Sequence, residues 1–302
     1  MTQSENKQID FSVVIAAWNG VSLLHDCLLS LEKQIEKGGA EVIVVSNFET
    51  GISENEKRFP FAKHIVLSEK TTVPELRTRG ILETRGAIVA LLEDFCTSDC
   101  KWRGEIEKAH EKSYSIVGGV IENSSRMTAL NWAVYFYDYG KYMLPVSSGV
   151  TDTLSGMNVS YKREVLDLLR ENYENGFFEF FIHEELKRRK HQLYLMPSAV
   201  ILHNKNYDLK RVSVQFYHQA RSFAARRVVS FPFSKRFSFL MASLTLPILL
   251  PARVVLRTIS KKRRFKELII SVPFLMILMS VWALGEFCGY LYGEGNSGKE
   301  WK

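Results

Sequence analysis

An apolar run that ends in two acidic residues constrains this chain more than any other feature. Residues 88–92 follow Gly86, read Ile-Val-Ala-Leu-Leu, and lead directly into Glu93 and Asp94. A short, wholly apolar run of this kind is typical of an inner strand of a parallel sheet. Open α/β sheets bind ligands at the carboxyl ends of their strands, so we expect Glu93 and Asp94 to lie in a binding site. An ordinary acidic loop after a buried strand is the alternative.

Strand-like and helix-like segments alternate along the first half of the chain. The expected strands are 11–17, 41–46, 62–67 and 88–92, and the expected helices are 21–34 and 74–85. This alternation predicts the α/β class, with a mostly parallel sheet flanked by helices. A length of 302 residues and a hydrophobic content of 46% are sufficient for a large core.

The final third of the chain is different, because it holds two long apolar runs. Residues 237–252 include Pro247 and Pro251 and are shorter than the roughly 20 residues of a membrane span. We therefore expect this run to be interfacial or re-entrant. The segment 268–291 is expected to be transmembrane, because it opens with an uncharged run close to the length of a span and has interfacial aromatics, Trp282 among them, near its end. A buried core helix is the alternative for this segment.

The positions of the basic residues indicate which class of partner the chain binds. The net charge is +7 and the pI is 9.1, values that suit nucleic acid, anionic lipid or a phosphorylated substrate. Lysines and arginines crowd into 226–236 and 253–266, on both sides of the first apolar run, where lipid headgroups would lie. We therefore expect membrane lipids, and no nucleic acid, as partners.

The cysteines and the amino terminus indicate the compartment. Cys96 and Cys100 lack the paired spacing of a zinc site, and residues 1–10 are polar, unlike a signal peptide. We expect the soluble part to lie in a reducing cytoplasm.

Five short motifs follow one another along the chain, at 11–20, 41–47, 74–81 with 85–94, 156–163 and 197–203. In this order they resemble the motifs of the family-2 glycosyltransferases, inverting enzymes of the GT-A fold, over nearly all of the cytoplasmic part of the chain. The first three resemble the family's nucleotide loop, second strand, and helix with its acidic-motif strand. The last two resemble an acceptor-side strand and a strand that closes the donor site with a histidine.

The resemblance implies a set of site residues. The implied donor-binding residues are Ala17, Asn19, Asn47, Arg77, Glu93, Asp94 and Arg221. Gly156 and Asn158 lie on the implied acceptor side, and Asp94 and His203 are the implied metal ligands for Mg²⁺ or Mn²⁺. Phe95 stands where the family has a metal-binding aspartate, so one oxygen ligand is missing and cationic residues are the alternative to a metal.

Transfer of a sugar needs a base for the acceptor hydroxyl, and the segment 177–189 offers candidates. Glu179 and His183 are four residues apart, on one face of the expected helix, and Glu184 follows. We favour Glu179 as the base, because flanking phenylalanines would shield it and raise its pKa. The alternative is a solvated amphipathic helix with an i,i+4 pair.

These observations predict a GT-A-like domain over 1–232 and a membrane-associated helical segment over 233–302. The expected function is inverting transfer of a sugar from a nucleotide-sugar donor to a lipid-linked or membrane-near acceptor, at the cytoplasmic face of the inner membrane. The alternative is a non-catalytic nucleotide-sugar-binding or scaffold subunit of a membrane polysaccharide-assembly system.

Overall fold

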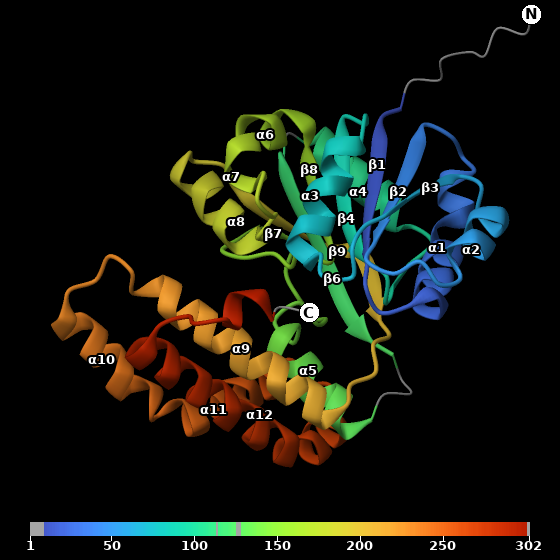
Figure 1. Cartoon of the computed structure of the whole chain (residues 1–302). Coiled ribbons are helices and arrows are strands. Elements are labelled where there is room, and N and C mark those ends of the chain that lie inside the picture. Colours follow the sequence, from blue (N-terminus) through green and yellow to red (C-terminus); the bar gives the residue numbers. More distant parts are fainter. Residues whose placement is uncertain (1–8, 113, 125–127, 301–302) are drawn as a thin grey trace, which may run out of the picture. The chain divides into compact units, whose positions relative to one another are not determined.

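The structure is a computed structural model that describes residues 9–112, 114–124 and 128–300 (Figure 1). The chain forms two compact units. The first comprises residues up to 122 together with 144–204, and the second comprises 123–143 together with 205 onwards. Because the second unit includes a segment from the middle of the chain and begins again at 205, this division does not coincide with the boundary expected at residue 232.

The first unit is a mixed sheet flanked by helices. The strands are β1 (Phe11–Ala17), β2 (Ala40–Ser46), β3 (Ala62–Val66), β4 (Ile88–Glu93), β5 (Cys96–Ser98), β6 (Ile116–Asn123), β7 (Gly149–Thr151), β8 (Val159–Lys162) and β9 (Leu193–His203). Their order is β3-β2-β1-β4-β8-β6-β9-β5, with β7 paired to β9. Strands β1 to β4 are parallel, whereas β8 runs antiparallel to both β4 and β6. The expected mostly parallel α/β class is confirmed.

Seven helices of this unit lie among the described residues. They are α1 (Val21–Ile35), α2 (Ile52–Arg58), α3 (Val73–Glu83), α4 (Trp102–Glu111), α6 (Arg163–Leu168), α7 (Arg170–Tyr173) and α8 (Glu179–Arg188). Helix α3 begins where the sequence specifies it, because Thr72 and Glu75 form a capping box and Pro74 lies in the first turn.

The register of β1 against β4 positions the site. Phe11 pairs with Ile88 and Ala16 with Glu93, so the two strands end at the same edge of the sheet. Every residue of β1 is buried, and β4 is buried from Val89 onwards, as expected for inner strands. Gly86 lets the two strands start close together, because a Cβ there would lie 2.8 Å from the backbone of Phe11.

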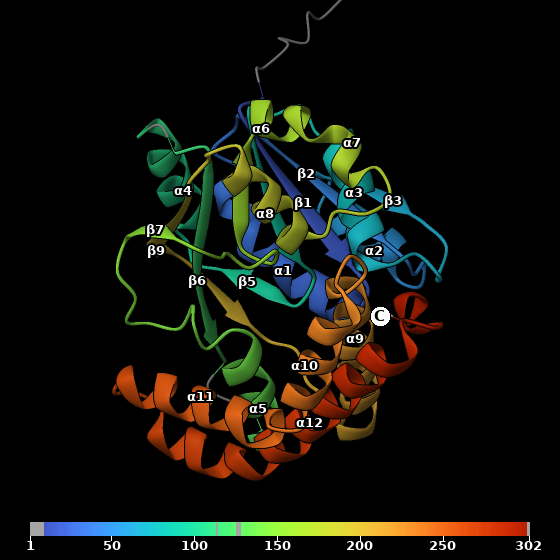
Figure 2. The same cartoon turned by 90° about the vertical axis from the view of Figure 1, so that its left-hand side faces the viewer.

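The second unit is helical. It contains α5 (Ala129–Asp138), α9 (Leu209–Arg227), α10 (Phe233–Ser243), α11 (Leu246–Ser260), α12 (Phe265–Tyr292) and the 3₁₀ helix η1 (Ser297–Lys299). Helix α12 contacts α5, α9, α10 and α11, and these helices run together in Figure 2. The middle segment 123–143 belongs to this unit because α5 packs against α12.

Among the described residues, α12 is the one helix that is by itself long and apolar enough to cross a membrane. Helices α10 and α11 meet the same criterion together, but they are bent by 66° at a short break. Pro247 lies in the first turn of α11, just after this break, where a proline is compatible with a helix start.

Candidate active site

Asp94 fixes the loop that follows β1. Its Oδ2 accepts hydrogen bonds from the backbone amides of Trp18 at 2.9 Å and Asn19 at 2.6 Å, and its Oδ1 accepts one from Asn19 Nδ2 at 2.7 Å. Asp94 is fully buried. Burial raises the pKa of Asp94 to about 6, although the hydrogen bonds from Asn19 and Trp18 oppose this shift. The carboxylate of Asp94 therefore holds the expected nucleotide loop in place by accepting hydrogen bonds from neutral amide groups.

Glu93, the neighbour of Asp94, is held by a different group. The guanidinium of Arg77 on α3 forms ion pairs with both Glu93 and Glu179, donating from Nη2 to Glu93 and from Nη1 to Glu179 Oε2 at 2.7 Å. Arg77 and Glu93 are buried, whereas the Glu179 side chain is 34% exposed. Arg77 thus connects the end of β4 to the start of α8.

Gly156 lies directly against this ion-pair bridge. A Cβ at Gly156 would be 2.8 Å from Glu179 Cδ and 2.9 Å from Arg77 Nη1, so a larger residue would displace the carboxylate. The structure therefore brings together three residues that the sequence assigned to different roles: a donor ligand, a base and an acceptor-side glycine.

The environment of Glu179 differs from the expected apolar shield. Phe180 is exposed and its ring packs with that of Phe181, which is also exposed. Burial acts to raise the pKa of Glu179, but the charge and hydrogen bond of Arg77, together with a backbone hydrogen bond and the nearby His183, outweigh burial and lower the pKa below its usual value. The expectation of a raised pKa is wrong, because the sequence does not show that an arginine a hundred residues earlier pairs with this carboxylate.

The two other candidates on α8 have partners of their own. His183 is buried, and its Nε2 lies 2.7 Å from the hydroxyl of Tyr161 on β8. Glu184 forms an ion pair with Lys187 at 2.5 Å near the surface. Tyr161 was not identified from the sequence, where it is only one apolar position of a strand. Its bond to His183 attaches α8 to the sheet.

Two of the predicted binding residues form hydrogen bonds with other groups of the protein. Asn158 is fully buried, and its Nδ2 donates to the carbonyls of Val120 and Ala199 while its Oδ1 accepts from Trp102 Nε1. Asn47 donates through Nδ2 to the carbonyl of Thr71 at 3.1 Å. Asn158 therefore joins α4, β6 and β9 in the core by hydrogen bonds, whereas Asn47 follows β2, at the same sheet edge as Asp94.

His203 and Phe95 pack together at the end of the acidic motif. Their ring centroids are 5.1 Å apart, and Phe95 also contacts Trp18 edge-on. His203 is fully buried at the end of β9, opposite Cys96. The position expected for a metal-binding carboxylate is therefore part of an aromatic cluster.

These residues do not fit a divalent cation held by the protein. Hard cations need several oxygen ligands, but Asp94 is buried with both oxygens accepting hydrogen bonds, and Glu93 is paired with Arg77. No group of three or more histidine, cysteine, aspartate or glutamate side chains in the described part of the chain is arranged to hold a metal ion.

Ala17 and Arg221 complete the predicted donor set. Ala17 ends β1, and its carbonyl accepts a hydrogen bond from the amide of Asn47 at 3.2 Å, which joins the two loops. Arg221 lies on α9 in the second unit, where its Nε donates to the carbonyl of Gly293 at 3.0 Å.

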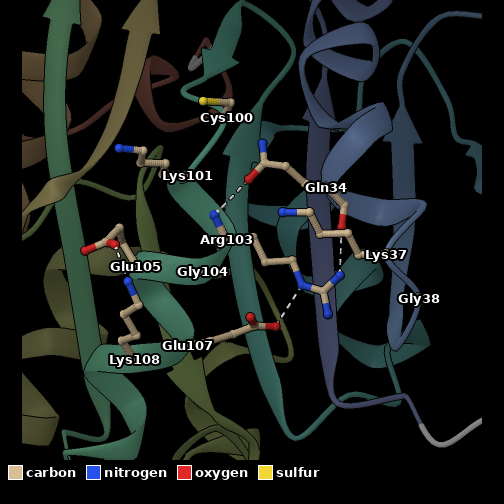
Figure 3. A pocket seen from close by; sticks show the side chains of 10 residues that line it. All are labelled: Gln34, Lys37, Gly38, Cys100, Lys101, Arg103, Gly104, Glu105, Glu107 and Lys108. Carbon is tan, nitrogen blue, oxygen red and sulfur yellow. Dashed lines mark hydrogen bonds and ion pairs between the residues drawn. The ribbon is translucent and has the colours of Figure 1, made fainter.

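A separate hollow of about 480 Å³ lies between the end of α1 and the start of α4 (Figure 3). Arg103 lines it and is already paired with Glu107 and with the carbonyl of Gln34. The hollow is near the start of β1, because the neighbouring Gly39 accepts a hydrogen bond from Phe11. It is therefore at the opposite sheet edge from Asp94, away from the strand ends where such sheets bind ligands.

Comparisons with known proteins show the family and the fold of the chain. A family model described as Glycosyl transferase family 2 matches residues 12–170, which is just over half of the chain and includes Asp94, Arg77 and Gly156. A search of curated proteins found no match. A solved structure of the mannosyltransferase PcManGT from Pyrobaculum calidifontis, in complex with GDP-Man and Mn²⁺, is similar in fold, with a TM-score of 0.58. The two sequences are 12% identical, and the match covers 93% of this chain and 88% of that one.

Proposed function

The chain belongs to glycosyl transferase family 2, and from this premise we propose that it is an inverting glycosyltransferase in which Glu179 is the catalytic base. The family membership supports transfer of a glycosyl group. The observation that carries the mechanism is the ion-pair bridge from Glu93 through Arg77 to Glu179, which lies against Gly156.

Inversion in a single displacement needs a base on the acceptor side that is ionised before the reaction begins. Arg77 helps to keep Glu179 in this form by lowering its pKa, and we propose that an acceptor hydroxyl reaches this side chain, which is 34% exposed. As the hydroxyl oxygen attacks the anomeric carbon, its proton passes to Glu179 and the bond to the nucleoside diphosphate breaks. Arg77 then neutralises two carboxylates and is a positioning residue, not a phosphate ligand.

The donor is proposed to be a nucleotide sugar bound at the carboxyl edge of the sheet. The loop of Trp18 and Asn19, clamped by Asp94, and the neighbouring Asn47 would form the nucleotide side of this site. The GDP-Man in the mannosyltransferase structure supports a donor of this class.

No step of this mechanism passes through a metal, because the two acids of the motif, Asp94 and Glu93, already accept hydrogen bonds from protein groups. The alternative is a divalent cation brought in with the diphosphate of the donor, and the Mn²⁺ of the mannosyltransferase structure supports it. In that case we expect the cation to bind only when the nucleotide is present.

The acceptor is proposed to be lipid-linked or close to a membrane, with the catalytic domain on the cytoplasmic face of the inner membrane. Support comes from the second unit, where α10, α11 and α12 carry exposed large apolar side chains, including Phe233, Ile248 and Ile269. Such a surface would hold the enzyme beside a lipid substrate.

A thermal-shift screen followed by a transfer assay tests this function. Nucleoside diphosphates and their sugars should raise the unfolding temperature in proportion to affinity, because they bind only the folded state. Mn²⁺ alone should have no effect, and a further rise with Mn²⁺ and nucleotide together would establish the metal alternative. A bound nucleotide sugar that is neither hydrolysed nor transferred to membrane-extract acceptors would favour the scaffold alternative.

A further inference from the structure

The exposed apolar side chains of the second unit follow one face of α12. Exposed positions include Ile270 at 53%, Ile277 at 46% and Leu284 at 55%. Seven residues are nearly two helical turns, so these three side chains lie in one row. The row extends along α12 from near its start to near its end, and α10 and α11 add further exposed apolar residues, such as Phe237 and Leu256.

The segment formed by these three helices and their connections has the same net charge as the whole protein. Residues 233–292 contain nine lysines and arginines but two glutamates, which gives +7, the net charge of the entire chain. Arg253 is exposed on the face of α11 that carries Leu249 and Leu256, because it is four residues from one and three from the other. Lys262 is exposed three residues after the exposed Ile259. Apolar and cationic groups therefore share this surface.

The opposite face of α12 is packed against a polar helix. A Cβ at Gly285 would be 2.5 Å from the carbonyl oxygen of Tyr217, and one at Gly289 would be 2.4 Å from that of Arg221, both on α9. Helix α9 has five lysines and arginines, at 210, 211, 221, 226 and 227. Close packing of this kind means that α12 could not enter the hydrocarbon region lengthwise without taking the charged α9 with it.

A buried polar cluster inside the unit leads to the same conclusion. Glu286, near the carboxyl end of α12, accepts hydrogen bonds from Trp282 Nε1 at 2.9 Å and from the Tyr290 hydroxyl at 2.8 Å. Arg227 on α9 forms an ion pair with Glu286 at 3.5 Å. The sequence predicted aromatic anchors at a membrane interface near this end of α12. Trp282 and Tyr290 instead donate hydrogen bonds to Glu286 inside the unit, so they are not free to act as such anchors.

We propose that α10, α11 and α12 bind an anionic bilayer along its surface, with α12 lying in the interfacial plane instead of crossing the membrane. The exposed row of α12 would enter the acyl-chain boundary, and the flanking cations would meet anionic headgroups. This inference rests on the membrane association proposed above and replaces the spanning arrangement that the sequence predicted for 268–291.

Binding to vesicles tests the charge component. The full-length protein should bind vesicles of phosphatidylcholine and phosphatidylglycerol more tightly than vesicles of phosphatidylcholine alone. The double variant Arg253→Gln/Lys262→Gln should weaken binding to the anionic vesicles about 30-fold, as expected for two cations near the surface. The matched control is Lys33→Gln/Lys57→Gln, which removes two exposed lysines from α1 and α2 and should leave binding unchanged.

Depth measurements test the orientation. In a background with Cys100→Ser and Cys288→Ser, single variants Ile270→Cys, Ile277→Cys and Leu284→Cys would carry a fluorescent label. Lipids brominated at different depths should then quench the three labels at one similar, shallow depth. The same labelled proteins without vesicles give the baseline.

Two outcomes would overturn the inference. A label at 277 that lies deeper than those at 270 and 284 would establish a spanning helix. Absence of vesicle binding would overturn membrane association itself. Hydrolysis of the donor in the vesicle-free sample reports on the transferase function separately, so failure of either proposal can be recognised.

Discussion

Glu93 and Asp94 are neighbours in the chain, yet the structure places them in opposite environments. Asp94 is surrounded by neutral amides, and burial raises its pKa to about 6. Glu93 instead pairs with the guanidinium of Arg77, which also pairs with Glu179. Successive side chains of a strand point to opposite faces, so two neighbouring acids at a strand end can take part in two separate sets of interactions. The Asp94 side fixes the loop after β1, and the Arg77 side holds Glu179, the proposed base.

The largest expected effect is on the Arg77 side. Glu179→Gln should lower kcat by about 100- to 10,000-fold with little change in donor affinity, because the variant loses the proton acceptor but keeps the size of the side chain. Steady-state kinetics together with donor binding by calorimetry measures the two quantities.

Glu184→Gln is the matched control for this variant. Glu184 is on the same helix but pairs with Lys187 near the surface, so its loss should leave turnover close to that of the wild type. If Glu184→Gln or His183→Ala abolishes turnover while Glu179→Gln does not, the base has been assigned to the wrong residue.

The Asp94 side should affect donor binding more than the chemical step. Asp94→Ala leaves the amides of Trp18 and Asn19 without their acceptor, so the loop should lose its fixed conformation. Loss of buried partners costs about 1–3 kcal/mol, which corresponds to about 5- to 150-fold weaker nucleotide binding if the loop forms the site. Titration calorimetry measures the nucleotide affinity of the variant. An unchanged affinity would mean that the Asp94 loop is not part of the donor site.

A third variant examines how the bridge tunes the base. Arg77→Lys keeps one charge but cannot pair with two carboxylates in the same forked geometry, so the pKa of Glu179 should rise. Because the base acts in its ionised form, the acid limb of the kcat/KM profile should move to higher pH. A lower rate with an unshifted limb would mean that Arg77 supports the fold alone. Circular dichroism checks that the variant is folded.

The two sides were not equally predictable from the sequence. The strand ending in Glu93 and Asp94 and the mostly parallel sheet followed from periodicity and from the rule that ligands bind at strand ends. The partners of these acids could not be predicted, because Arg77 and Glu179 are a hundred residues apart and their pairing depends on how α3 and α8 are placed.

The helical region shows a second limit of sequence patterns. An uncharged run of helical residues predicts a membrane span by its length and composition. The pattern cannot show that Gly285 and Gly289 allow α9 to pack closely, or that Glu286 is buried among partners from the same unit. Hydropathy records the side chains of one helix, whereas the preferred location of α12 depends on its neighbours.

The last expected effect is on stability and again distinguishes the two acids. The folded-state pKa of Asp94, about 6, is above its ordinary value of 3.8, so the folded state binds more protons between these pH values than the unfolded state. Stability contributed by this group is therefore present below pH 4 and is lost as the pH rises through 6, by up to about 3 kcal/mol. In Asp94→Asn this slope should be absent, while other titrating groups, such as Asp138, are common to both proteins and cancel in the difference. Denaturant unfolding of both proteins at several pH values between 4 and 7 measures that difference. A constant difference across the range would mean that Asp94 is ionised throughout, and that the amides of Trp18 and Asn19 compensate fully for its burial.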